Sequence, residues 1–134
     1  MLENNSYISK NASIHSTVKI GPFCYIGDNV KIDKNCELKS HVSIIGNTHI
    51  GKDNIFYPFS SIGSEPQDLK FENEKSFLII GNNNTFRENV TANPGTKGGG
   101  LKTVIILYYS FKTSTFCTRI SSNVFSKSII ITDN

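Results

Sequence analysis

A six-residue repeat is the feature of this sequence that most constrains its fold. Ten large apolar residues follow one another at a spacing of six without a gap, and a small or β-branched residue precedes most of them by two positions. The ten are Ile8, Ile14, Ile20, Ile26, Ile32, Leu38, Ile44, Ile50, Phe56 and Ile62. A period of six matches neither an isolated helix nor an alternating strand. It predicts a solenoid in which each hexapeptide forms one side of a triangular prism and three hexapeptides form one coil.

The repeat therefore predicts an all-β fold, a left-handed parallel β-helix, which we place at residues 1–103. The large residue of each hexapeptide is expected to fill the axis, and the smaller one to lie near a corner. Glycine and asparagine are expected to supply the left-handed φ of the corners. Cys24 and Cys36 occupy the small inward position, so we interpret them as core residues rather than nucleophiles.

Two stretches break the repeat, and we expect them to loop out from the prism at residues 64–79 and 94–102. Because Ile62 and Ile80 are three hexapeptides apart, the first loop is expected to replace one coil's worth of chain. Loops on a rigid scaffold are where binding sites are common. The first contains Gln-Asp-Leu-Lys at 67–70. This segment is either a polar clamp for a hydroxyl-rich substrate or a phosphate, or a solvated loop. The triple glycine at 98–100 lacks the spacing of a phosphate-binding loop.

Composition argues against several other classes of protein. The longest purely apolar run is four residues, so no membrane span is expected, and the N-terminus lacks the pattern of a signal peptide. With a net charge of +3 and no basic cluster interleaved with aromatics, we expect no nucleic-acid partner. The three cysteines have no metal-binding spacing, and the three histidines, His15, His41 and His49, are interpreted as surface residues rather than metal ligands. A cytoplasmic protein is the default expectation.

Short motifs in the repeat and its loops resemble one family, the acyl-carrier-protein-dependent UDP-N-acetylglucosamine O-acyltransferases of lipid A biosynthesis. The resemblance covers about residues 8–103 and depends most on the Gln-Asp-Leu-Lys loop, the Leu-Lys-Ser-His-Val segment and the triple glycine. The motifs are Ile20-Gly-Pro-Phe-Cys24, Leu38-Lys-Ser-His-Val42, Ser61-Ile-Gly63, Gln67-Asp-Leu-Lys70, Ile80-Gly81, Arg87-Glu88, Val90-Thr91 and Gly95-Thr96 through Gly98-Gly-Gly100.

The resemblance implies a cytoplasmic homotrimer that moves a (3-hydroxy)acyl chain from acyl carrier protein to the 3-hydroxyl of UDP-N-acetylglucosamine, the first step of lipid A biosynthesis. It implies no cofactor and no metal. Asp68 and Lys70 would contact the nucleotide sugar, and Gln67 would lie beside the acyl chain, in sites between neighbouring subunits. A histidine general base would take the proton of the attacking hydroxyl, and a backbone N–H would stabilise the oxyanion.

Residues 104–134 depart from the family pattern. They contain no glycine, one acid and no histidine, and the six-residue period is absent. Rereading the codons from Tyr108 onward one base later allows a family-like sequence, with a histidine at the codon of Thr118. We interpret this as a frameshift near residues 104–107 that truncates the β-helix. The tail is then expected to be irregular, and the chain, which lacks the expected catalytic histidine, is expected to be inactive.

Two alternatives remain open at the level of sequence. One is a non-catalytic solenoid fragment that acts as a binding or assembly module. The other is a different hexapeptide enzyme, either the N-acyltransferase that acts later in the same pathway or a carbonic anhydrase. The Gln-Asp-Leu-Lys loop argues against that N-acyltransferase, and the dispersed histidines argue against a carbonic anhydrase.

Overall fold

The computed structural model describes residues 5–66, 72–97 and 100–105, and its regular elements are short parallel strands. In chain order they are β1 (Tyr7–Ile8), β2 (Ser13–Ile14), β3 (Lys19–Ile20), β4 (Tyr25–Ile26), β5 (Lys31–Ile32), β6 (Glu37–Leu38), β7 (Ser43–Ile44), β8 (Thr48–Ile50), β9 (Ile55–Phe56), β10 (Ser61–Ile62), β11 (Phe77–Ile80), β12 (Thr85–Phe86), β13 (Thr91–Ala92) and β14 (Lys102–Ile105). Within these ranges no helix is long and apolar enough to cross a membrane.

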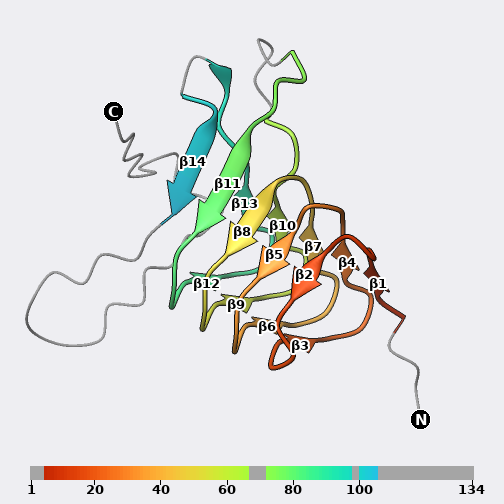
Figure 1. The fold of residues 1–134 in the computed structure, drawn as a ribbon. Coiled ribbons are helices and arrows are strands. Elements are labelled where there is room, and N and C mark those ends of the chain that lie inside the picture. Colours follow the sequence, from red (N-terminus) through yellow and green to blue (C-terminus); the bar gives the residue numbers. More distant parts are fainter. Residues whose placement is uncertain (1–4, 67–71, 98–99, 106–134) are drawn as a thin grey trace, which may run out of the picture.

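The strands form three parallel sheets that are the three sides of a prism (Figure 1). The first side is β1-β4-β7-β10-β13, the second is β2-β5-β8-β11-β14, and the third is β3-β6-β9-β12. In the regular coils each residue pairs with the one 18 positions later, as Ile32 does with Ile50. This arrangement is a left-handed parallel β-helix and confirms the predicted fold class.

The repeated apolar residues form one buried column along the axis. From Ile26 to Ile62 every predicted axial residue is at most 1% exposed, and the column continues through Ile80 and Phe86. The rings of Phe56 and Phe86 stack in it with centroids 4.8 Å apart. The smaller residues two positions earlier are also buried, including Cys24, Cys36 and Asn54. The sequence prediction of which residues point inward is therefore confirmed for these coils.

The corners follow the sequence prediction only in part. Asparagines do take left-handed φ, as Asn29 does at 58°, but so do Phe23, His41 and Phe59, at 58°, 53° and 64°. Their rings stack along the corner between the third and first sides, at centroid distances of 5.1 and 5.0 Å. Gly21, in contrast, has no left-handed φ; a Cβ there would lie 2.0 Å from the Lys39 carbonyl oxygen. Glycine is needed at that position for close approach and not for backbone freedom.

The loop boundaries also differ from the prediction. Ile80 pairs with Ile50 on the second side, which directly follows the side of Ile62, and the paired residues are 30 positions apart instead of 18. The first loop therefore adds 12 residues between neighbouring sides and does not replace a coil. Ile105 pairs with Ile80 at a separation of 25, so the second loop adds seven residues. The first loop ends earlier than predicted, because β11 begins at Phe77 and pairs along its whole length with β14.

The six-residue period is lost from Val104 onward, but the regular structure does not end there. Val104 and Ile105 are the last two residues of β14 and pair in parallel with Ile79 and Ile80. The Gly81 N–H donates to the Ile105 carbonyl at 2.7 Å, as in the coils below. Residues 106–134, the rest of the predicted tail, lie outside the described residues.

Candidate functional site

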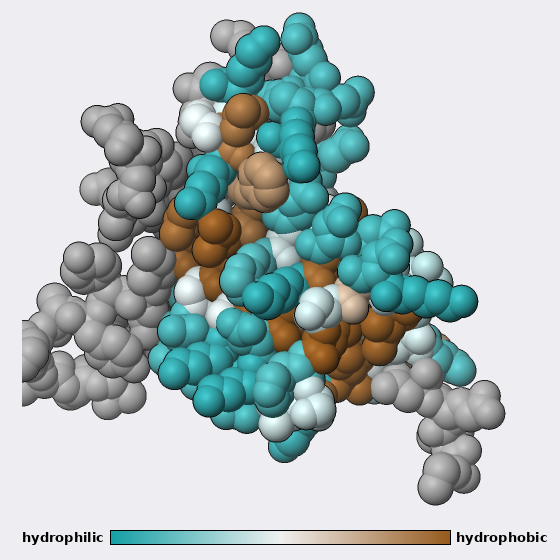
Figure 2. Space-filling view, viewed as in Figure 1, coloured by the Kyte–Doolittle hydropathy of each residue, from teal (hydrophilic) through white to brown (hydrophobic). Residues whose placement is uncertain are grey.

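The two insertions project from the same corner of the prism, between its first and second sides (Figure 1). We call residues 64–76 loop 1 and residues 93–101 loop 2. Loop 1 connects β10 to β11, and loop 2 connects β13 to β14 in the next coil. Figure 2 shows them as a mostly hydrophilic projection above the brown and teal body of the β-helix. A polar ligand could therefore be held between or beside them.

Hydrogen bonds join the two loops near their bases. The Asn93 side-chain amide donates to the Glu65 carbonyl at 2.8 Å, which ties the start of loop 2 to the start of loop 1. At the other base, the Phe77 N–H donates to the Leu101 carbonyl at 2.9 Å. Gly95 packs so closely on the first residue of β14 that a Cβ would lie 2.4 Å from the Lys102 nitrogen. The loops are thus anchored to each other as well as to the prism.

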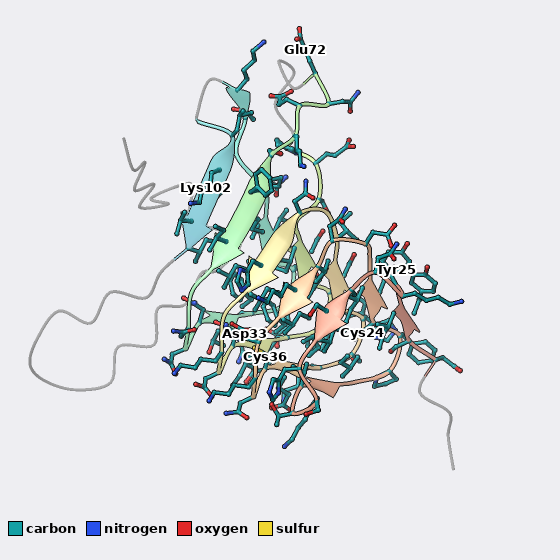
Figure 3. The ribbon with its side chains drawn as sticks, in the orientation of Figure 1. Cys24, Tyr25, Asp33, Cys36, Glu72 and Lys102 are labelled. Atoms are coloured by element: carbon teal, nitrogen blue, oxygen red, sulfur yellow. The ribbon has the colours of Figure 1, made fainter. Side chains whose placement is uncertain are left out.

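Glu74 makes a further connection between the two loops. Its Oε1 accepts a hydrogen bond from the Lys97 N–H of loop 2 at 2.9 Å, and its Oε2 accepts one from the Glu72 N–H at 2.7 Å. Hydrogen bonds from the backbone N–H groups of Glu74 itself, Lys97 and Glu72 lower the pKa of the Glu74 carboxyl group. The carboxylate is therefore ionised at neutral pH. Figure 3 shows Glu72 on the part of loop 1 that projects from the prism and Lys102 on β14.

The residues predicted to bind substrate are Gln67, Asp68 and Lys70, and all three lie outside the described residues. The same is true of Thr118, at whose codon the catalytic histidine is expected. The assignment of these residues stays a prediction. The neighbouring described residues place both ends of the segment, Pro66 and Glu72, in loop 1.

The three histidines contact different partners, and none is in the described parts of the loops. His15 Nδ1 is 2.9 Å from the Thr17 hydroxyl, and His49 Nε2 is 3.7 Å from an Asp33 carboxylate oxygen. His41 is held between two phenylalanine rings at another corner. Among the described residues no three histidine, cysteine or acidic side chains come together as a metal site.

Cys24 and Cys36 are core residues, as predicted. They are 2% and 1% exposed, and each thiol contacts a backbone carbonyl of the next coil. Desolvation by burial raises the pKa of both thiols. A protonated, buried thiol is a poor nucleophile, so neither cysteine is a catalytic candidate.

The Arg87-Glu88 motif is engaged in contacts on the prism. The Arg87 guanidinium lies 3.9 Å from the centroid of the Tyr57 ring, and its Nε donates to Glu88 at 3.1 Å. Lys39 approaches the same ring at 5.9 Å. Arg87, Tyr57 and Lys39 each come directly after a strand of the third side, at the corner between the third and first sides. The two loops project from a different corner, between the first and second sides.

Comparison with known proteins identifies the family. A model of the bacterial transferase hexapeptide (six repeats) matches residues 11–46. The acyl-[acyl-carrier-protein]–UDP-N-acetylglucosamine O-acyltransferase of Rickettsia canadensis is 54% identical over 98 residues, which are 73% of this chain. The crystal structure of a UDP-N-acetylglucosamine acyltransferase from Bacteroides fragilis superposes with a TM-score of 0.74 at 41% identity, over 78% of this chain. The matched part of the chain belongs to the UDP-N-acetylglucosamine O-acyltransferase family.

The chain is shorter than these acyltransferases. It covers 37% of the Rickettsia canadensis enzyme and 41% of the Bacteroides fragilis structure. This chain covers a similar share, 40%, of the UDP-N-acetylglucosamine O-acyltransferase from Moraxella catarrhalis, whose structure superposes with a TM-score of 0.74. The family and fold are therefore established here, whereas catalysis needs a separate argument.

The residues that connect the loops of this acyltransferase-family chain were missed at the level of sequence. Neither Asn93 nor Glu74 belongs to a recognisable motif. A signal was nevertheless available: counting sides in turn places loops 1 and 2 at the same corner of successive coils. Polar residues in two such loops are expected to meet.

Proposed function

We propose that this chain derives from an acyltransferase that transfers a (3-hydroxy)acyl group from acyl carrier protein to the 3-hydroxyl of UDP-N-acetylglucosamine, and that it binds the sugar nucleotide without completing the transfer. The observation that supports binding most directly is the pair of polar loops held together on a β-helix similar to the solved structures of this family. We further propose that Asp68 and Lys70 contact the nucleotide sugar, that Gln67 lies beside the acyl chain, and that the protein is a cytoplasmic homotrimer.

The proposed loss of turnover follows from the chemistry of the step. The sugar oxygen attacks the thioester carbonyl, a C–O bond forms, the C–S bond breaks, and a base must take the hydroxyl proton while the thiol leaves. None of the three histidines lies in the described parts of the two loops: His15 follows β2, His49 is in β8 on the second side, and His41 stacks between phenylalanine rings at the corner of the third and first sides. Losing a general base typically lowers the rate by about 10² to 10⁴. Binding, in contrast, does not require that base.

Calorimetry and an acyl-transfer assay on the same preparation test both halves of this proposal. We expect the chain to bind UDP-N-acetylglucosamine and to bind UDP alone more weakly, and we expect no ester product with hydroxyacyl-loaded acyl carrier protein. Asp68→Ala with Lys70→Ala should weaken binding, whereas Lys52→Ala, an exposed lysine at another corner, should not. Absence of binding by the unmodified chain would refute the proposed ligand, and measurable turnover would refute the proposed loss of catalysis.

Sedimentation analysis tests the proposed assembly. A trimer is expected, because the resemblance implies sites between neighbouring subunits. A monomer that still binds the sugar nucleotide would show that the part of the site in one chain is sufficient, and would overturn the assembly proposal alone.

A further inference from the structure

Two long loops that carry a ligand site need a means of holding a fixed geometry. Loop 1 adds 12 residues and loop 2 adds seven to the coils from which they project. Longer loops have more conformations to lose when they are ordered. The anchors at Asn93 and Phe77 fix only their bases. Between these two anchors, loop 2 needs a further contact to hold it beside loop 1.

Glu74 makes such a contact. Its two carboxylate oxygens accept hydrogen bonds from different N–H groups, one in its own loop at Glu72 and one in the other loop at Lys97. Lys97 directly precedes the triple glycine, so the contact fixes the point at which that glycine-rich segment begins. Hydrogen bonds from backbone N–H groups to an ionised carboxylate are stronger than those between neutral groups. The low pKa of this carboxyl group keeps it in the accepting form at neutral pH.

We propose that Glu74 is a positioning residue: it holds loop 2 against loop 1 in the geometry that the sugar nucleotide requires, without touching the ligand itself. This inference rests on the proposed function, because it concerns the ligand assigned there. It assigns a role to a residue for which the sequence motifs gave no signal.

A set of three variants separates this role from a general effect of charge. Glu74→Ala removes both acceptors. Glu74→Gln keeps one acceptor oxygen but presents an NH₂ group to the second N–H donor, so it should rescue partly. Glu72→Gln is the matched control, because it removes a carboxylate two residues away while the backbone N–H that Glu72 contributes to the contact is unchanged.

Two measurements are made on each variant of the full chain: amide hydrogen exchange at Lys97, and the dissociation constant for UDP-N-acetylglucosamine. We expect Glu74→Ala to raise both the exchange rate and the dissociation constant about tenfold, and Glu74→Gln about threefold, since one net hydrogen bond corresponds to a factor of this size. Glu72→Gln should change neither. The thermal midpoint of Glu74→Ala should fall only by the few degrees that the loss of one net hydrogen bond produces, because the contact is outside the core.

The outcomes separate this inference from the function on which it rests. Unchanged Lys97 exchange in Glu74→Ala, or unchanged affinity despite faster exchange, would overturn the positioning role. If the unmodified chain fails to bind UDP-N-acetylglucosamine, the proposed function fails and the positioning role for that ligand fails with it. In that case the exchange at Lys97 still shows whether Glu74 joins the loops.

Discussion

Replacing Gly21 by alanine should destabilise the β-helix far more than the same change at Gly27. Both glycines directly follow an axial isoleucine, so they occupy equivalent positions in the repeat. A Cβ at Gly21 would lie 2.0 Å from the Lys39 carbonyl oxygen, whereas one at Gly27 would be 3.3 Å from the Cγ2 methyl group of Ile45. Relieving the first overlap requires the backbones to separate by about 1 Å, because contacts shorter than 3.0 Å are essentially never observed.

That separation has a cost that can be worked from neighbouring contacts. The Gly21 N–H donates to the Leu38 carbonyl at 2.8 Å, and a displacement of about 1 Å would break this hydrogen bond. The loss is worth about 1 kcal/mol. Strain in the surrounding coil adds about 1–3 kcal/mol. We therefore expect Gly21→Ala to lower the free energy of unfolding by about 2–4 kcal/mol.

Urea unfolding followed by circular dichroism measures this difference directly. Gly27→Ala should change the free energy of unfolding by less than about 1 kcal/mol in either direction. Alanine lowers the conformational entropy of the unfolded chain, and this gain offsets the close contact of its Cβ in the folded chain. Equal unfolding midpoints for the two variants, at equal m-values, would refute the close-approach explanation. A large effect at both positions would show instead that the repeat needs glycine at these positions for another reason.

Two further predictions concern the buried polar residues. Asn54→Ala should lower the free energy of unfolding by about 3 kcal/mol. The Asn54 side chain donates to the carbonyls of Gly51 and Gly81 and accepts from the Asn84 N–H, and all three groups would lose a partner. Urea unfolding measures this loss, and a change below about 1 kcal/mol would contradict the prediction. Burial raises the pKa of the thiols of Cys24 and Cys36, so the folded chain holds these protons more tightly than the unfolded chain. The free energy of unfolding should therefore fall as the pH rises above the usual thiol value of 9.0, and alanine at both positions should flatten that dependence.

The six-residue period was sufficient to predict the prism, because the inward-facing positions of this solenoid recur every six residues along the sequence. The corners could not be predicted in the same way. Left-handed φ at Phe23, His41 and Phe59 goes together with ring stacking between coils, which a rule based on single-residue preference cannot anticipate. The residue type at a corner depends on the coils above and below it.

The connection between the loops was harder to predict for a different reason. Glu74 and Lys97 are 23 positions apart, in segments that lack the period. Their meeting depends on how many residues each loop adds, and that number follows only when Ile50, Ile80 and Ile105 are known to lie in register. The substrate-binding residues predicted in loop 1 rest on the family resemblance.

The register of β14 narrows the position of the proposed frameshift. Ile105 pairs with Ile80, continuing the series of paired isoleucines on the second side, and Val104 pairs with Ile79 beside it. A shift upstream of Val104 would place unrelated residues at these positions, so within the interval 104–107 the shift is expected at codon 106 or 107. Independent sequencing of the gene tests this. A family-like sequence should begin in the shifted frame at that point, with a histidine at the codon of Thr118. An early stop codon or unrelated residues in that frame would refute the frameshift, and the change in composition after Ile105 would then belong to the protein itself.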